Sequence, residues 1–282
     1  MDLRYYPVRP DLRELFGVYY SFESAGHVHQ PICAELGNIR IVLDGAGGIH
    51  WPDGRSAHFT EATVVGPTMS AYAVTATPGT RVFGIGILPY GWDALFGFSA
   101  AELTDRICNL RDCFGPANNR LVNEMTERMK GARDWRECAA IADHYLQLFA
   151  MARLDKIKRF PAGLEDWLLN PDRHGLDELV DLMDVSRRQT DRLAKYYFGA
   201  SPKALQRKYR ALHTLTRMSL GADSTWWEEN GHGFYDQSHF IKEFKTFVGA
   251  TPTQFLGDGA VLMAKSIQMR SRATHKPPLK HL

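Results

Sequence analysis

One stretch near the C-terminal end combines hydrogen-bonding side chains with large aromatic ones. It runs from Gly233 to Phe244 and is GFYDQSHFIKEF. A stripe of aromatics recurs at helical spacing, Phe240, Phe244 and Phe247. The opposite face of the same helix carries Ser238, His239 and Lys242, with Gln237 near the helix start. The spacing predicts an amphipathic helix with one buried face. The exposed face has the chemistry of base recognition, since Gln pairs with adenine while His and Lys reach bases or phosphates.

A second segment repeats the surroundings of this helix. YYFGASPKAL (196–205) and TFVGATPTQF (246–255) align with an offset of 50 residues. In each copy the glycine supplies the left-handed residue that ends a helix. Ser201 or Thr251 then caps a new helix, with proline at its first position. We therefore predict one supersecondary unit that is used twice.

The first copy predicts a helix-turn-helix. LDELVDLMDVSRRQTDRLAKYYFG has an apolar helix face, a turn at 184–186, and a second helix that Ser186 caps. The polar face of that second helix carries Arg187, Arg188, Asp191, Arg192 and Lys195. Arg pairs with guanine. Two such units on a linker helix, PKALQRKYRALHTLTRM, can enter successive major grooves about 34 Å apart.

Positive charge is concentrated in the region of the first helix-turn-helix and the linker helix. The whole chain has 34 Lys and Arg against 32 Asp and Glu, which alone says nothing about partners. Between Arg187 and Arg217, however, nine basic residues stand against the single acid Asp191. This is typical of a polyanion-binding surface, although a solvated helix face has the same composition. The residues predicted to contact phosphates are Lys195, Lys203, Arg207, Lys208 and Arg210.

The N-terminal part has a different pattern of apolar and turn residues. From Tyr19 to about Leu88, short apolar runs alternate with turn residues, which predicts a β-sandwich or barrel. Gly84-Ile85-Gly86 lacks the third glycine of a dinucleotide motif and indicates close strand packing instead. Helical periodicity follows Pro89, and Phe160–Gly163 is a plausible boundary.

GFYDQSHFIKEFKTFVGATPTQF resembles the signature of the AraC/XylS transcriptional regulators, whose DNA-binding domain contains two helix-turn-helix units. The resemblance covers roughly residues 159 to 263. GWDALFGFSAAELTDRI is similar to the N-terminal half of one branch, in which a cupin-like sensor precedes the DNA-binding domain. The positions that the resemblance assigns to base recognition are Arg188, Asp191, Arg192, Gln237, Ser238, His239 and Lys242.

The resemblance implies an α+β chain: an N-terminal β-rich cupin-like sandwich with flanking helices, then an all-α domain. The expected division is a sensor at 1–100, a linker or dimerisation segment at 101–158, the DNA-binding domain at 159–263, and a basic tail at 264–282. The expected function is a DNA-binding transcription regulator, an activator on family grounds, that responds to a small-molecule effector. The expected partners are operator DNA and RNA polymerase, with a homodimer as an open alternative.

The sequence departs from the family pattern at three places. Asp184 stands at the usual turn glycine and is expected to tolerate the left-handed region. Thr190 and Ala194 replace large apolar residues, which predicts a looser core. The segment 224–233, with its acids and glycines, predicts a short or frayed scaffold helix for the second unit.

Other residues of the N-terminal part fit different chemistry. His27, His29 and Glu35 resemble part of a cupin metal motif, with His50 or His58 as the further ligand, and the rival interpretation is a cupin-type metalloenzyme. The spacing of these residues differs from that of the cupin motif, so we expect no metal, no cofactor and no enzyme activity. A protein-interaction module is a third alternative. The aromatics Tyr19, Tyr20, Phe22, Trp51 and Tyr72 fit either a ligand pocket or ordinary strand core.

The cysteines and the hydropathy indicate a compartment. Cys33, Cys108, Cys113 and Cys138 form no C-x-x-C pair and no disulfide framework, which favours a reducing environment. Cys113 and His144 lack the flanking pattern of a nucleophile and base. No run reaches the ~18 apolar residues of a membrane helix. We expect a soluble, cytoplasmic protein.

Overall fold

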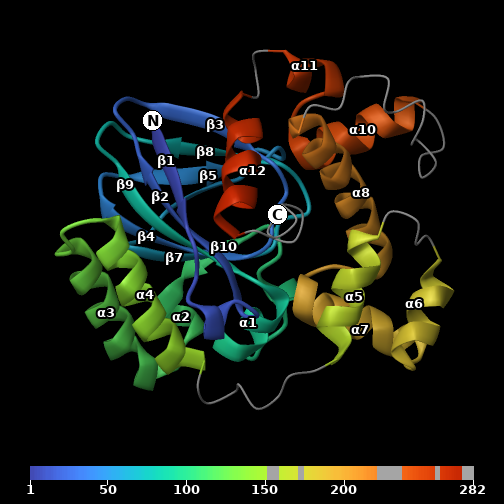
Figure 1. The fold of residues 1–282 in the computed structure, drawn as a ribbon, viewed down its shortest axis with the longest axis horizontal. Helices are drawn as coiled ribbons and strands as arrows, with labels where there is room; N and C mark the ends of the chain where they lie inside the picture. The colour runs from blue at the N-terminus through green and yellow to red at the C-terminus, as the bar shows by residue number, and fades with distance from the viewer. Residues whose placement is uncertain (151–158, 171–174, 221–236, 258–260, 275–282) are drawn as a thin grey trace.

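The computed structural model describes residues 1–150, 159–170, 175–220, 237–257 and 261–274. The described strands all precede residue 110, and helices make up the C-terminal part (Figure 1). The predicted fold class, a β-rich N-terminal sandwich followed by an all-α part, is confirmed. Among these residues, no helix combines the length and apolar character that crossing a bilayer requires.

Two antiparallel sheets form the N-terminal part. The larger has the order β1-β2-β9-β4-β7-β10 and the smaller β3-β8-β5-β6. The larger sheet comprises β1 (Asp2–Tyr6), β2 (Phe16–Glu23), β9 (Arg81–Ile87), β4 (Asn38–Asp44), β7 (Ala62–Val65) and β10 (Ile107–Asn109). The smaller comprises β3 (Val28–Ile32), β8 (Tyr72–Ala76), β5 (Gly47–His50) and β6 (Ser56–His58). Short 3-10 turns, η1 (Pro10–Leu12) and η2 (Ala100–Glu102), lie between strands or after them.

Gly84 illustrates the close strand packing that the sequence predicts. It faces Tyr20 on β2 and Arg40 on β4 in the strand register. A Cβ atom at Gly84 would lie 1.9 Å from the Tyr20 ring. The missing side chain therefore lets the Tyr20 ring cross β9, where its hydroxyl accepts a hydrogen bond from Arg40 Nε at 3.1 Å.

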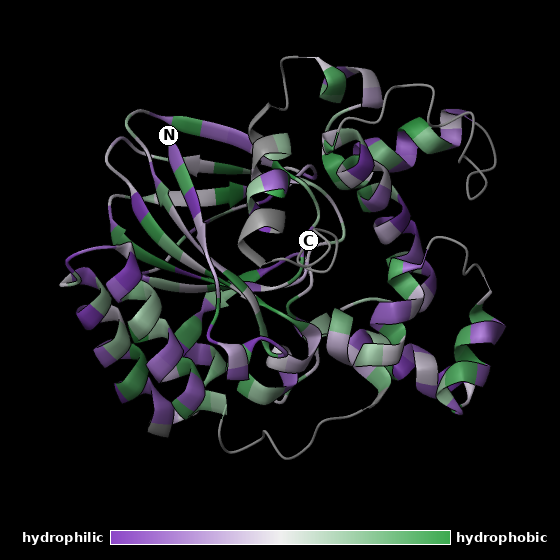
Figure 2. Cartoon of the chain, in the orientation of Figure 1, coloured by the Kyte–Doolittle hydropathy of each residue, from purple (hydrophilic) through white to green (hydrophobic). Residues whose placement is uncertain are grey.

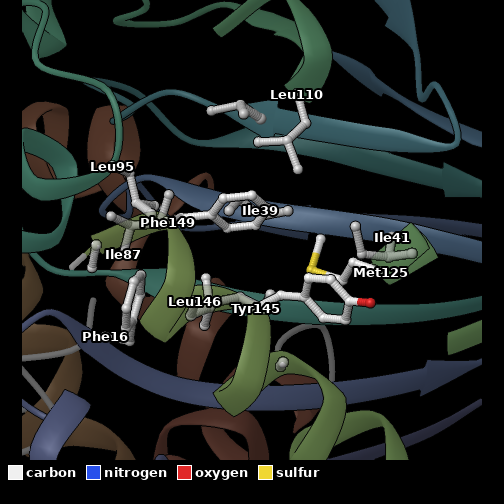
Figure 3. Packing of buried hydrophobic residues seen from close by; sticks show 14 of the residues in the cluster. Phe16, Ile39, Ile41, Ile87, Leu95, Leu110, Met125, Tyr145, Leu146 and Phe149 are labelled. Atoms are coloured by element: carbon white, nitrogen blue, oxygen red, sulfur yellow. The ribbon is translucent and has the colours of Figure 1, made fainter. Parts of the chain in front are cut away.

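Four helices share the hydrophobic core of the larger sheet. They are α1 (Pro89–Leu95), α2 (Leu110–Cys113), α3 (Pro116–Lys130) and α4 (Trp135–Ala150). Figure 3 shows strand residues such as Ile39 and Phe16 packed near Tyr145 and Phe149 of α4. Residues 101–150, expected as a linker or dimerisation segment, thus complete the core of the N-terminal part.

The C-terminal part is built from seven described helices. They are α5 (Arg159–Leu169), α6 (Leu176–Met183), α7 (Arg187–Phe198), α8 (Pro202–Ser219), α10 (Gln237–Val248), α11 (Pro252–Leu256) and α12 (Val261–Thr274). Gly199 ends α7 with φ 85°, and Gly249 follows α10 with φ 86°. Ser201 caps α8 and Thr251 caps α11 through their side chains. The predicted repeat of stop, cap and restart is confirmed.

Amphipathic faces hold these helices together. Figure 2 shows hydrophobic and hydrophilic residues alternating along α8 and α10. Phe240, Phe244 and Phe247 are all buried, as the spacing predicts. Phe240 and Phe244 share a core with Leu212 and Leu215 of α8.

The C-terminal helix returns to the sheets. α12 begins at Val261, before the domain boundary expected at 263, and continues to Thr274. It lies against β1 and β2 as well as α8 (Figure 1). Residues 264–274, part of the expected basic tail, belong to this helix.

Candidate nucleic-acid interface and inter-sheet cavity

Helices α6 and α7 form the first helix-turn-helix. Asp184 ends α6 in the left-handed region, with φ 53° and ψ 46°, so the aspartate does replace the usual glycine. Ser186 caps α7, and its side chain and that of Gln189 form a reciprocal capping box. The start of α7 is therefore fixed by local hydrogen bonds, which orient the side chains of its first turns.

The predicted contact residues of α7 lie on its outer face. Arg187, Arg188, Arg192 and Lys195 are exposed, and Asp191 is half-buried. Asp191 pairs with Lys195 at 2.7 Å, and Arg187 pairs with Asp177 of α6. Thr190 and Ala194, on the inner face, are fully buried. The core at these small residues is thus closed to solvent.

Helix α10 presents the second polar face. Gln237, Ser238 and Lys242 are exposed, and His239 is half-buried. The structure brings all four residues onto the first turns of one helix, as expected. The atypical segment 224–233, whose scaffold helix was expected to be short or frayed, lies outside the described residues.

A buried carboxylate joins α10 to α8. Glu243 is 2% exposed and accepts a hydrogen bond from Arg207 Nε at 2.5 Å. Arg210 lies 3.8 Å from its other oxygen, Oε2, and His239 Nε2 lies 3.4 Å from Oε1, the oxygen that Arg207 binds. Arg207 and Arg210, predicted as phosphate contacts, therefore also position the second recognition helix. The sequence offered no signal for this role of Glu243 beyond an acid one helical turn after His239.

The side chain of Lys208 is buried, whereas a residue that contacts a DNA phosphate must be exposed. Its side chain is 1% exposed, and its Nζ donates to the main-chain oxygens of Glu35 at 2.7 Å and Thr68 at 2.9 Å. Burial lowers the pKa of Lys208 to about 8. The expected phosphate contact at Lys208 is therefore wrong for this conformation, because the side chain points from α8 into the N-terminal part. Lys195 and Lys203 remain exposed.

Both recognition helices also contact the N-terminal part, through their C-terminal turns. At α7, Tyr196 donates to Asp93 of α1 at 2.6 Å, and Thr104 donates to the Gly199 carbonyl at 2.8 Å. At α10, the carbonyls of residues 246 and 247 accept from the backbone of Ala71 and Ala34 at 2.8 and 2.7 Å. The predicted base-contacting residues lie in earlier turns of the two helices, and Lys242 among them also lines a pocket with His29 and His50 of the smaller sheet.

A cavity of about 120 Å³ lies between the two sheets. Its walls are mainly apolar. The lining includes Leu3, Phe22, Val28, Ile32, Phe59, Val74 and Val82, with Met263 and Ile267 from α12. Of the five aromatics with two open interpretations, Tyr20 and Phe22 line this cavity, whereas Tyr19 belongs to the core. Trp51 and Tyr72 pack in a smaller core cluster.

Charged side chains gather at one end of the cavity. Glu35 Oε1 accepts hydrogen bonds from Tyr72, from Asn38 at 2.9 Å and from Arg40 at 3.1 Å. Arg270 of α12 lies 3.8 Å from Glu35 Oε2. Opposite charges and tyrosine hydroxyls around Arg40 and Arg270 outweigh burial and hold both guanidinium pKa values above their usual range.

The sequence patterns do not reveal this cluster. They present Glu35 only as a candidate metal ligand and assign no role to Arg40. The one available signal was an arginine between isoleucines in the strand NIRIVLD, because a charge on an otherwise apolar strand needs a partner. The partner on α12 could not be found from spacing, since it lies more than two hundred residues away in the chain.

The discounted sites show other arrangements. Within the described ranges, no three His, Cys, Asp or Glu side chains come together as a metal site. His29 and His50 stack with ring centroids 6.1 Å apart. Cys113 Sγ lies 2.6 Å from Cys108 Sγ, whereas His144 packs on the ring of Tyr145.

Two family models match the chain. Residues 179–258 match a helix-turn-helix domain, and residues 4–109 match a domain of unknown function, DUF6597. No sequence among curated proteins matches significantly. The chain thus contains a helix-turn-helix domain, and this domain follows a β-rich N-terminal part.

Solved structures align with the chain at low sequence identity. An apo form of ToxT from Vibrio cholerae strain SCE256 aligns over 85% of this chain and 96% of its own, at 11% identity and a TM-score of 0.45. ToxT from Vibrio cholerae O395, bound to (E)-4-(8-methylnaphthalen-1-yl)but-3-enoic acid, aligns over 90% and 97% at 12% identity and 0.45. The AraC-like transcriptional activator CuxR aligns over 72% and 78% at 13% identity and 0.31.

Proposed function

We propose that this protein is a sequence-specific transcription regulator whose helices α7 and α10 enter successive major grooves of DNA. The observation that carries the proposal is the pair of amphipathic recognition helices. Each buries its aromatic or apolar face and leaves its polar first turns exposed. They are joined by α8, whose 18 residues span about 27 Å, comparable to one turn of DNA.

The proposed base contacts are those that lie on the exposed turns. They are Arg187, Arg188, Asp191 and Arg192 from α7, and Gln237, Ser238, His239 and Lys242 from α10. Lys195 and Lys203 are the proposed phosphate contacts, with Arg207 and Arg210 in a mixed role because Glu243 engages both. Phosphate contacts supply affinity for any sequence, and the base contacts supply discrimination.

The inter-sheet cavity is the proposed effector site. Its walls suit an apolar body, and its charged end contains two guanidinium groups, Arg40 and Arg270, against the single carboxylate Glu35. The effector class that fits best is a largely apolar molecule with a polar group that can hydrogen-bond to this end of the cavity.

The resemblance further implies activation of transcription, a contact with RNA polymerase and, as an open alternative, a homodimer. In vitro transcription from a bound promoter, with and without the effector, determines the sign of regulation. Sedimentation of the protein with and without DNA determines the oligomeric state.

Selection of duplexes from a random library by the full-length protein tests the DNA-binding proposal. We expect enrichment of a site with two specific segments about 10 base pairs apart, centre to centre. Substituting Arg188 should relax the preference in one segment, and substituting Lys242 should relax it in the other. A library that emerges without any enriched sequence would contradict the proposal.

A further inference from the structure

Two cysteine thiols lie close together at the junction between β10 and α2. Cys108 is the middle residue of β10 and pairs with Val64 of β7, and Cys113 is the last residue of α2. Between them, Asn109 caps α2 by accepting a hydrogen bond from the Arg111 amide at 3.0 Å. This turn from strand to helix places the two sulfur atoms 2.6 Å apart.

The same two thiols are the accessible ones among the four cysteines of the chain. Both are half-buried, whereas Cys33 and Cys138 are buried. Burial raises the pKa of Cys33 and that of Cys138 to about 11 each. Since the thiolate is the reactive form of cysteine, we expect these two buried thiols to be inert toward dissolved oxidants.

The hydrogen bond within the pair favours a thiolate on one of its members. A hydrogen bond from the Cys113 thiol lowers the pKa of Cys108, and burial only partly opposes this effect. The same hydrogen bond raises the pKa of Cys113, and burial raises it further. Cys108 is therefore the sulfur that ionises first, and Cys113 is the thiol that keeps its proton.

We propose that Cys108 and Cys113 are a modification site at which a hydroperoxide forms a reversible intramolecular disulfide. The Cys108 thiolate attacks one oxygen of the hydroperoxide, the O–O bond breaks, and the leaving oxygen takes up a proton, so that Cys108 becomes a sulfenic acid. The Cys113 sulfur then attacks the Cys108 sulfur. The S–S bond forms, the S–O bond breaks, and the leaving hydroxide departs as water with the proton of Cys113. With hydrogen peroxide, two thiols and one peroxide molecule yield one disulfide and two water molecules.

The site lies on the segment that contacts the first recognition helix. Shortly before β10, Ser99 donates to the main-chain oxygen of Lys195 at 3.3 Å, and Thr104 donates to that of Gly199 at 2.8 Å. These contacts hold the last turn of α7 against the N-terminal part. A disulfide joins β10 to α2 covalently, so it restrains the segment that carries both donors. The chemistry of the site is independent of the proposed DNA binding.

Peptide mapping of the full-length protein tests the proposal. The reduced protein is treated in its folded state with hydrogen peroxide, and the remaining thiols are counted after denaturation. Trypsin cleaves after Arg111, which lies between the two cysteines, so their disulfide links the peptides 107–111 and 112–120. The parent is compared with Cys108→Ser, with Cys113→Ser and, as a control at a buried cysteine, with Cys138→Ala. Circular dichroism verifies that each variant is folded.

We expect the treated parent to lose two of its four thiols, to yield the linked peptides, and to recover all four thiols with dithiothreitol. Cys138→Ala should yield the same linked peptides. Neither serine variant should yield them. A dimedone adduct should accumulate on Cys108 in the variant Cys113→Ser, because no second thiol is present to displace the sulfenic acid. Amide exchange at residues 196–199 should slow when the parent is oxidised.

Each part of the proposal has a result that would overturn it. A treated parent that keeps all four thiols, or that links other peptides, would show that this pair is not the site. A dimedone adduct on Cys113 in Cys108→Ser, without one on Cys108 in Cys113→Ser, would reverse the assigned order of attack. Unchanged amide exchange at residues 196–199 would exclude an effect of the disulfide on α7. None of these results affects the DNA-binding proposal, which the duplex selection described above tests.

Discussion

The Nζ atom of Lys208 lies 2.7 Å from the main-chain oxygen of Glu35, a residue 173 positions earlier in the chain. The same ammonium donates to the Thr68 carbonyl at 2.9 Å. Helix α8, which connects the two recognition helices, is thereby fastened to the loop that also places the Glu35 carboxylate at the cavity. One residue of the linker thus contacts the backbone of the proposed effector site.

The pH dependence of stability should reveal this buried ammonium. Desolvation lowers the pKa of Lys208 from the usual 10.5 to about 8, although Cys33 and Glu35 partly oppose the shift. Between these values the unfolded chain binds a proton that the folded chain does not, so this lysine's contribution to stability increases as pH rises through the window. The same contribution decreases again as the pH falls from 10.5 toward 8.

Denaturant unfolding of the parent and of Lys208→Met measures that contribution by difference. The free energy of unfolding of the parent minus that of the variant should increase by on the order of 3 kcal/mol from about pH 7 to about pH 10.5. Lys203→Met, which alters an exposed lysine on the same helix, should give a flat difference. A flat difference for Lys208→Met as well would show that the ammonium is not buried in solution.

The local parts of this fold follow from short-range chemistry. Ser186, Ser201 and Thr251 each cap the helix that the sequence assigns to them, and Asp184 adopts the left-handed conformation. Each outcome depends on residues within four positions of one another. The helical spacing of the phenylalanines likewise determines which face of α10 is buried, so the polar recognition faces were predictable.

The cavity and the attachment of α8 to the N-terminal part depend on contacts between residues far apart in the sequence, which no local pattern encodes. In the sequence, Lys208 looks like the other basic residues of α8. It differs from the exposed Lys203 because two backbone carbonyls of the N-terminal part accept hydrogen bonds from its ammonium. Glu35 looked like a metal ligand because histidines precede it, but its oxygens face Arg40 and Arg270. The contact with Arg270 in particular joins residues more than two hundred positions apart, and such a pair can be recognised only once the fold places its members together.

Arg188 and Arg192 are expected to determine the specificity of the first helix-turn-helix. Both are exposed on α7, one turn apart. Substitution of either by alanine should weaken binding to the selected site by about 1–3 kcal/mol, because a bidentate contact to guanine is lost. Binding to random DNA should weaken much less. Fluorescence anisotropy with specific and random duplexes gives both affinities, and an unchanged ratio between them would count against the assignment.

Lys203 is expected to contact a phosphate, unlike Lys208. Its side chain is exposed in the first turn of α8. Lys203→Ala should weaken binding to all duplexes alike and reduce the slope of log affinity against log salt concentration by about 0.9, the value for one phosphate. Titrations over a range of potassium chloride concentrations measure this slope. A slope equal to that of the parent would place Lys203 outside the interface.

Glu243 is expected to support DNA binding without contacting DNA. Its buried carboxylate holds Arg207 and Arg210 of α8 and lies beside His239, so it fixes α10 against the linker. Glu243→Gln should lower the free energy of unfolding by about 1–3 kcal/mol, since a charged partner of a buried network is lost. It should also reduce discrimination in the DNA segment that α10 contacts more than in the segment that α7 contacts. Glu127→Gln, at an exposed carboxylate on α3, is the control and should change neither quantity. Equal loss in both DNA segments would indicate that Glu243 stabilises the whole domain and not the placement of α10.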